Sequence, residues 1–206
     1  MGNTGSFTVK ATIQPLLYVF TTWESKEMKE FLLRGLHELP ETFGIRFFEM
    51  EFLLGKELVE FFTCRSIFHD IFDTDKNLLV DKLEVMSVVC LVSRQSNLEK
   101  IHFFFDLFNF NNKGYLLESE IKLMLLAVSR GCYKADQKYV PSPMKVIDEL
   151  TAECLRCARV DKTYVRKPEL VQFVLMNKDV LAFLDSWRGH ASQVLLAESS
   201  YIHTPL

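Results

Sequence analysis

Side chains that carry oxygen recur at the first, third, fifth, ninth and twelfth positions of one twelve-residue stretch, 73–84. They are Asp73, Asp75, Asn77, Asp81 and Glu84, with the backbone carbonyl of Leu79 at the seventh position. Calcium takes roughly six to eight oxygen ligands, and a loop that wraps one ion supplies them at this spacing, with a bidentate glutamate last. The stretch is therefore predicted to bind one calcium ion. Turn and capping chemistry alone is the alternative explanation for an acidic loop before a helix.

The sixth position of this stretch, where the chain must turn sharply, carries Leu78 and not the glycine expected there. A bulky side chain in a left-handed backbone conformation costs roughly 1–2 kcal/mol. That cost corresponds to about a tenfold loss of affinity or somewhat more. We therefore expect the site to be weakened and not abolished.

A final glutamate followed by apolar residues recurs in four twelve-residue stretches, which begin at residues 38, 73, 109 and 158. Apolar residues stand one, four and five places after each glutamate, and this spacing is typical of one face of a helix. An apolar residue also stands eighth in each stretch, in a position to pair with its neighbour; these residues are Ile45, Val80, Leu116 and Val165. The pattern predicts an all-α fold of four helix–loop–helix units.

The other three stretches lack the oxygen ligands. In 109–120, Lys113 stands fifth and Leu117 ninth, so an ammonium occupies a position where calcium needs an oxygen. The ligand positions of 158–169 hold Ala158, Val160, Lys162 and Arg166, and those of 38–49 hold Pro40, Thr42 and Arg46 with Phe43 sixth. We therefore expect at most one calcium ion for each chain.

The overall charge agrees with a single calcium site. The chain has 24 Lys and Arg against 27 Asp and Glu, a formal charge of −3. Several working calcium loops would make it more acidic, and a nucleic-acid partner would require a more basic chain. No glycine-rich phosphate loop, nucleophile elbow or metal-hydrolase spacing occurs, so we expect a protein that is not an enzyme.

Phenylalanine is frequent, with 18 residues, most of them clustered around the first three stretches. Most are expected in the core, but they carry more apolar surface than a helix face can bury, so some are expected to line a groove for a partner's amphipathic helix. The pair Cys154 and Cys157 could indicate zinc or a redox centre. No second such pair occurs, so both are expected to be buried as small apolar residues.

The amino terminus begins Met1-Gly2-Asn3-Thr4-Gly5-Ser6, which fits the pattern for myristoylation of Gly2. One myristoyl chain gives only marginal membrane binding, and Lys10 is the sole basic residue nearby. Any membrane association is therefore expected to be weak and reversible.

Together the Gly2 pattern, the four stretches and the longer gap before the last one resemble the EF-hand superfamily, and within it the neuronal calcium sensor and calcineurin B-like proteins. The resemblance covers about residues 20–187. Leu39-Pro40 is similar to that family's non-binding first hand, and 178–184 to its closing helix. It implies hands paired in two lobes, a hydrophobic groove for a target helix and a lipid that is buried or extruded. The family usually keeps binding-competent second, third and fourth loops, so this chain departs from it in the last two.

The expected organisation is an amino-terminal segment, two pairs of hands and a tail, at 1–22, 23–95, 96–187 and 188–206. Between the last two hands, 131–143 is interpreted as a linker because it ends in two prolines, and 144–157 as a helix.

These features lead us to expect an adaptor that holds a partner helix or larger assembly in its groove whatever the calcium level. The alternative is a regulatory sensor in which calcium at 73–84 alters the groove, reversibly associated with a membrane. The expected location is cytoplasmic, in part at a membrane, with the cytoskeleton or the cilium as the alternative.

Overall fold

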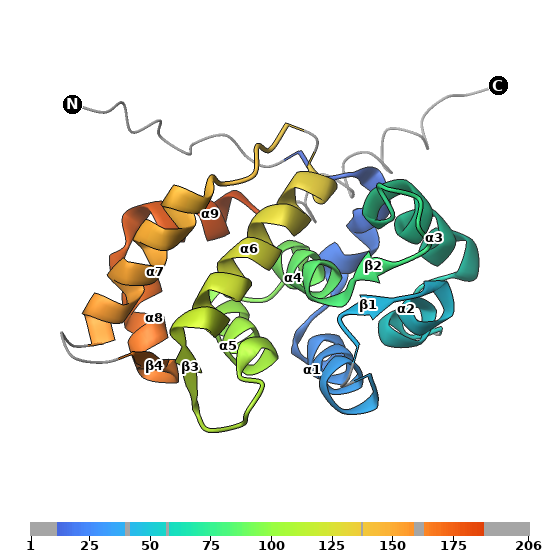
Figure 1. Cartoon of the computed structure of the whole chain (residues 1–206). Helices are drawn as coiled ribbons and strands as arrows, with labels where there is room; N and C mark the ends of the chain where they lie inside the picture. Colours follow the sequence, from blue (N-terminus) through green and yellow to red (C-terminus); the bar gives the residue numbers. More distant parts are fainter. Residues whose placement is uncertain (1–11, 40–41, 57, 137, 159–162, 188–206) are drawn as a thin grey trace, which may run out of the picture.

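The computed structural model describes residues 12–39, 42–56, 58–136, 138–158 and 163–187 (Figure 1). The described chain is mostly helical, with short antiparallel strand pairs, so the predicted all-α class is confirmed. Gly2 and the tail 188–206 lie outside the described residues.

The first half of the chain begins with a 3-10 helix and contains two helices, α1 and α3, that continue into short π-helical turns. In chain order the elements are η1 (Pro15–Thr22), α1 (Ser25–Leu33), η2 (Arg34–Glu38), β1 (Gly44–Ile45), α2 (Phe47–Leu54), α3 (Phe61–Ser66), η3 (Ile67–Phe72), β2 (Val80–Asp81) and α4 (Lys82–Val92).

The second half repeats this order with longer and more regular helices. Its elements are α5 (Asn97–Phe108), β3 (Tyr115–Leu117), α6 (Glu118–Ala135), α7 (Met144–Ala158), β4 (Tyr164–Arg166), α8 (Lys167–Met176) and α9 (Lys178–Ser186). Helix α7 confirms the helix predicted at 144–157.

The strands join the loops in pairs at the residues that the spacing predicts. β1 lies antiparallel to β2 with Ile45 opposite Val80, and β3 lies antiparallel to β4 with Leu116 opposite Val165. All four side chains are buried. The apolar positions after each glutamate are buried as well, apart from Leu125, which is half-buried. Each loop is therefore fixed at its middle by a strand partner and at its end by a packed helix.

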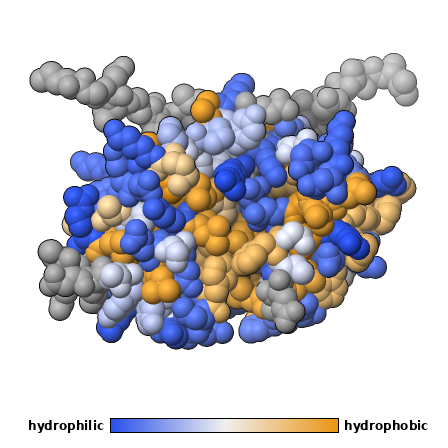
Figure 2. Space-filling view, viewed as in Figure 1, coloured by the Kyte–Doolittle hydropathy of each residue, from blue (hydrophilic) through white to orange (hydrophobic). Residues whose placement is uncertain are grey.

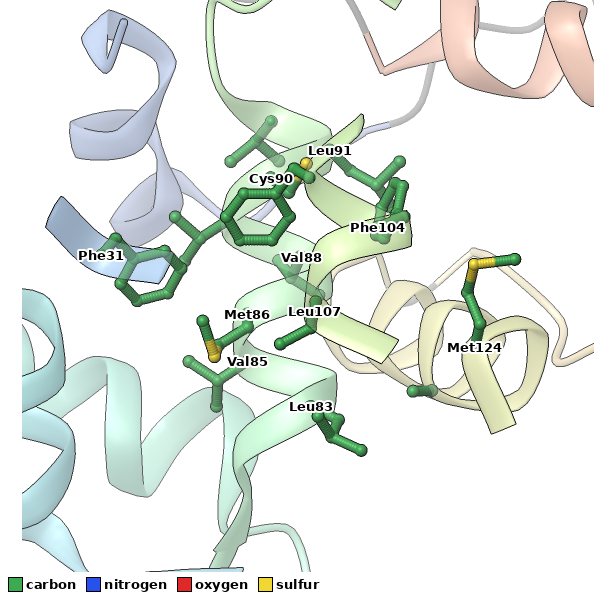
Figure 3. Close-up of a cluster of buried hydrophobic side chains, with 14 of the residues drawn as sticks. Phe31, Leu83, Val85, Met86, Val88, Cys90, Leu91, Phe104, Leu107 and Met124 are labelled. Atoms are coloured by element: carbon green, nitrogen blue, oxygen red, sulfur yellow. The ribbon is translucent and has the colours of Figure 1, made fainter. Parts of the chain in front are cut away.

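Helix α4 lies at the centre of the molecule, and each of its residues is buried (Figure 1). It packs mainly against η1, α5 and α6. Figure 3 shows Met86 and Val88 between Phe31 and Leu107, and Leu91 near Phe104. The buried apolar side chains form one continuous core that includes both strand pairs. The first described residues join this core, because Leu17 and Phe20 of η1 are fully buried.

The segment 131–143, expected to be a linker, is helical in its first part, because α6 continues to Ala135. Gly131 does not break the helix. A Cβ added to it would lie 2.8 Å from Val88 Cγ2 and 2.9 Å from the Glu84 carbonyl oxygen. The glycine therefore allows the backbones of α4 and α6 to approach closely, and the linker begins only after this crossing.

The phenylalanines divide into a buried and an exposed group. Those of α5 are buried, as expected for a core. In contrast, α2 and α3 expose four rings, those of Phe48, Phe52, Phe61 and Phe62. Figure 2 shows hydrophobic residues at the surface on this side of the molecule.

The cysteines also divide. Cys154 is buried, and its burial raises the pKa of the thiol to about 12, whereas Cys157 is exposed. The expectation that both are buried was therefore wrong for Cys157, because the buried stripe of α7 runs through Ile147, Thr151, Cys154 and Ala158 and Cys157 lies to one side of it.

The close helix crossing generates a stability prediction. Gly131→Ala should lower the free energy of unfolding by about 1–3 kcal/mol, because the added methyl meets backbone and cannot be accommodated by a side-chain rotation. On helix propensity alone, alanine would instead gain about 1 kcal/mol. Urea denaturation followed by circular dichroism measures the change. Gly44→Ala is the control, since a Cβ there meets nothing within 4 Å. Unchanged stability of G131A would contradict the close crossing.

Candidate calcium site

The loop 73–84 takes the backbone conformation of a tight turn despite Leu78. Lys76 and Leu78, its fourth and sixth residues, have φ of 56° and 64°. Asn112 and Gly114, the fourth and sixth residues of 109–120, have φ of 53° and 74°. Leu78 thus occupies the left-handed conformation that glycine provides in the other loop, at the energetic cost of a side chain there.

Side chains of the first half of the loop hold its turn. Asp73 is buried, and both of its carboxylate oxygens accept from the Leu78 N–H at 3.3 Å. Asn77 Oδ1 accepts from the Leu79 N–H at 2.8 Å, and Asn77 Nδ2 donates to Asp75 Oδ2 at 2.7 Å. Each of these three predicted ligands therefore accepts a hydrogen bond from another residue of the loop.

Asp81, the predicted ligand at the ninth position, also begins the following helix. Its Oδ1 accepts from the Leu83 N–H at 2.8 Å and from the Glu84 N–H at 3.1 Å. Aspartate at such a position satisfies backbone donors that the first turn of a helix leaves free. This carboxylate therefore has a structural role in α4 that does not depend on a metal ion.

Glu84, the predicted bidentate ligand, meets a cation from the other half of the chain. The ammonium of Lys134, near the end of α6, lies 2.9 Å from Glu84 Oε2 and also donates to the Phe72 carbonyl at 2.9 Å. Both side chains are largely shielded, with 6% of the Glu84 side chain and 17% of the Lys134 side chain exposed. Burial raises the pKa of Glu84 above its ordinary value, and the Lys134 ammonium opposes that rise.

The final glutamates of the other three stretches behave differently. Glu49, Glu120 and Glu169 each accept a hydrogen bond from the backbone N–H three residues earlier, at 2.7–2.8 Å. They therefore cap the first turn of the following helix, as a glutamate at this position commonly does. In the second loop Asp81 accepts from other donors, the N–H groups of Leu83 and Glu84. The Glu84 carboxylate lies against the Lys134 ammonium.

The predicted ligands come from one loop but are not assembled around a single point. Among the described residues, no three His, Cys, Asp or Glu side chains gather closely enough to hold a metal ion. Calcium binding would thus require these side chains to move closer together.

Lys134 is the residue of this site that the sequence did not reveal. It lies fifty residues after Glu84, in a segment interpreted as a linker. In the sequence, Lys134 is marked only by its position three residues after Gly131. That position becomes informative only when α6 is known to continue to Ala135 and to cross α4 at Gly131.

Comparisons with known proteins give a partial match. No family model matches the chain. Calcium-binding protein K of Dictyostelium discoideum is 34% identical to it over 90 residues, which is 42% of this chain and 43% of that protein. The match thus spans less than half of the relative's length. It supports a relationship to an EF-hand-like calcium-binding family.

Only one of the four loops has oxygen side chains at the ligand positions, which predicts a stoichiometry of one calcium ion at most. Isothermal titration of the wild-type chain with calcium should give a single binding event, and Glu84→Gln should remove it, because the bidentate ligand supplies two of the required oxygens. Glu120→Gln is the matched control, because it alters the same position in a loop that has Lys113 and Leu117 among its ligand positions. Two or more sites, or binding that survives E84Q, would contradict this assignment.

The backbone at Leu78 predicts that Leu78→Gly stabilises the chain in chelator. Relief of the left-handed leucine gains about 1–2 kcal/mol, while the greater freedom of glycine in the unfolded chain costs about 0.5–1 kcal/mol. The net gain in the free energy of unfolding should be about 1 kcal/mol or less, measured in urea.

Leu79→Gly is the control for this measurement. Leu79 is also exposed, but it is not among the residues with positive φ, so glycine there should only destabilise. If L78G were as destabilising as L79G, the strain at Leu78 would be disproved.

Proposed function

We propose that this chain is a non-enzymatic EF-hand protein, related to the neuronal calcium sensor and calcineurin B-like proteins, that works as an adaptor for a protein partner. In this proposal it binds one calcium ion at 73–84 and an amphipathic helix of the partner in its second half. The observation that carries the adaptor role is an apolar cavity of about 170 Å³ that lies among α5, α6, α7, α8 and α9.

The residues of the second loop suit calcium. Its donors are carboxylates, one amide and one backbone carbonyl, the hard oxygen ligands that calcium prefers. Asp73, Asp75, Asn77, Asp81 and Glu84 would supply the side-chain oxygens, and Leu79 the carbonyl. The turn at Leu78 matches the turn at Gly114. The partial relative, whose name describes it as calcium-binding, supports the same assignment.

The cavity has the character of a site for apolar side chains. Helix α6 contributes Met124, Leu125 and Val128, and α9 covers part of it with Val180 and Phe183. Its volume is below the range of about 300–1,000 Å³ usual for ligand pockets. A partner helix would therefore insert a side chain beside α9 or replace α9 on the cavity.

The loops nearest to the cavity explain why an adaptor is favoured. The helices that line it flank 109–120 and 158–169, whose ligand positions hold lysine, arginine and apolar residues. Calcium has no site there, so it cannot open this cavity directly. A groove that forms without an ion can hold a partner at any calcium level, provided that the apolar contacts exceed the cost of opening.

A sensor is the second candidate, because α6 is shared between the cavity and the calcium loop. Its first turns carry Met124 and Val128 of the cavity, and its last turn carries Lys134, which contacts Glu84. A ligand shifts an equilibrium only through different affinities for the two states. Breaking the Lys134–Glu84 pair would be such a difference.

The proposed location is the cytoplasm, with weak and reversible membrane contact through acylated Gly2. No helix among the described residues is long and apolar enough to cross a membrane. A cytoskeletal or ciliary assembly is the alternative site for an adaptor, and a nucleic acid is not proposed as a partner, in view of the net charge of −3.

Adaptor and sensor differ in how much partner they recover from cells with and without calcium. The adaptor is expected to be insensitive to calcium. The tagged chain should recover the same partner from cells in calcium and in chelator, in amounts within about threefold. Val128→Asp, which introduces a charge at the cavity, should abolish recovery, whereas Ser119→Asp, at an exposed position of the same helix, should not. Circular dichroism of both variants checks folding.

A fall of tenfold or more in chelator would favour the sensor. It corresponds to about 1.4 kcal/mol of coupling between calcium and the partner. The adaptor would then be rejected.

A further inference from the structure

We propose that Lys134 is a built-in cation that competes with calcium for Glu84, so that calcium binds only as this ammonium withdraws. The inference rests on the proposed calcium site and adds a regulatory element to it. It makes the affinity of the loop depend on a helix from the other half of the chain.

The ammonium joins the two ends of the calcium loop. Phe72, whose carbonyl accepts from Lys134, directly precedes the first ligand, Asp73, and Glu84 is the last ligand. Both contacts are 2.9 Å. A positive charge therefore already lies where the loop begins and ends, and it neutralises a carboxylate that burial would otherwise disfavour.

The backbone holds Lys134 in this place. Gly131 brings α6 so close to α4 that a Cβ would lie 2.9 Å from the Glu84 carbonyl oxygen. Lys134 stands three residues later, on the same face of α6, since residues three apart are neighbours on a helix. The distance between the helix and Glu84 is thus set by packing, so Lys134 is a permanent neighbour of the loop and not a chance surface contact.

The Glu84 carboxylate is engaged differently from the other final glutamates. Glu49, Glu120 and Glu169 each accept from the backbone N–H three residues earlier, whereas the Glu84 carboxylate lies against the Lys134 ammonium. Calcium needs both oxygens of this carboxylate. An ammonium held at one of them would repel a divalent ion strongly in such a shielded place, so the two cations exclude each other.

The test is calcium titration of three single variants beside the wild type. Lys134→Met removes the competing charge and keeps an unbranched chain, and it should raise the affinity for calcium at least tenfold. Lys145→Met is the matched control. It removes the same charge from α7, where the side chain is 86% exposed and pairs only loosely with Glu149 at 3.9 Å. Its affinity should remain within about threefold of wild type. Glu84→Gln should not bind calcium.

The outcomes separate the two proposals. If the wild type binds calcium, E84Q does not, and K134M binds no more tightly than the wild type, the competition is wrong and the calcium site stands. If neither the wild type nor K134M binds calcium, the site and the competition both fall. If K134M binds calcium and the wild type does not, the competition is supported, and Lys134 then excludes calcium completely from the wild-type chain.

A second measurement needs no variant and covers the case in which K134M fails to fold in chelator. Lysines of the wild-type chain are labelled with an amine-reactive ester and mapped by mass spectrometry, with and without calcium. Labelling of Lys134 should increase in calcium at least threefold, while that of Lys145 stays the same. Equal labelling of Lys134 in calcium-bound and calcium-free chain would overturn the proposal.

Discussion

The close crossing of α4 and α6 at Gly131 is the contact on which the rest of this molecule depends. Helix α4 is buried along its whole length, so its sides must be covered by other elements, and α6 covers one of them. The absence of a side chain at Gly131 lets the two backbones approach. As a result the two pairs of loops share one continuous core, and a residue of the second half lies against the loop of the first.

The four loops keep common structural features although three of them lack the oxygen side chains that calcium needs. Their eighth residues still pair across short strands, and the helices after them still bury an apolar face. Three of the final glutamates remain useful because they accept a hydrogen bond from the backbone at the start of a helix. A glutamate at this position is therefore weak evidence for calcium by itself.

Helix α6 contacts both the apolar cavity and the loop 73–84. One part lines the apolar cavity of the second half, and the last turn carries Lys134 to the loop 73–84 of the first. A rigid helix of this kind can carry a displacement between two sites, because packed interfaces change between discrete arrangements and do not deform gradually. In the proposed function, the choice between adaptor and sensor depends on how strongly this helix couples the two ends.

The sequence by itself determined the helical class, the strand partners and the candidate ligands. These follow from local rules: apolar residues at helical spacing define buried faces, and Ile45 and Val80 stand at equivalent positions of their loops, so they meet when the loops pair. The tertiary structure alone decided that Gly131 is a helix contact and not a linker, that Cys157 is exposed, and that Lys134 reaches Glu84. The physical reason is distance along the chain. Glu84 and Lys134 are fifty residues apart, and no local preference of either residue reports the packing that brings them to 2.9 Å.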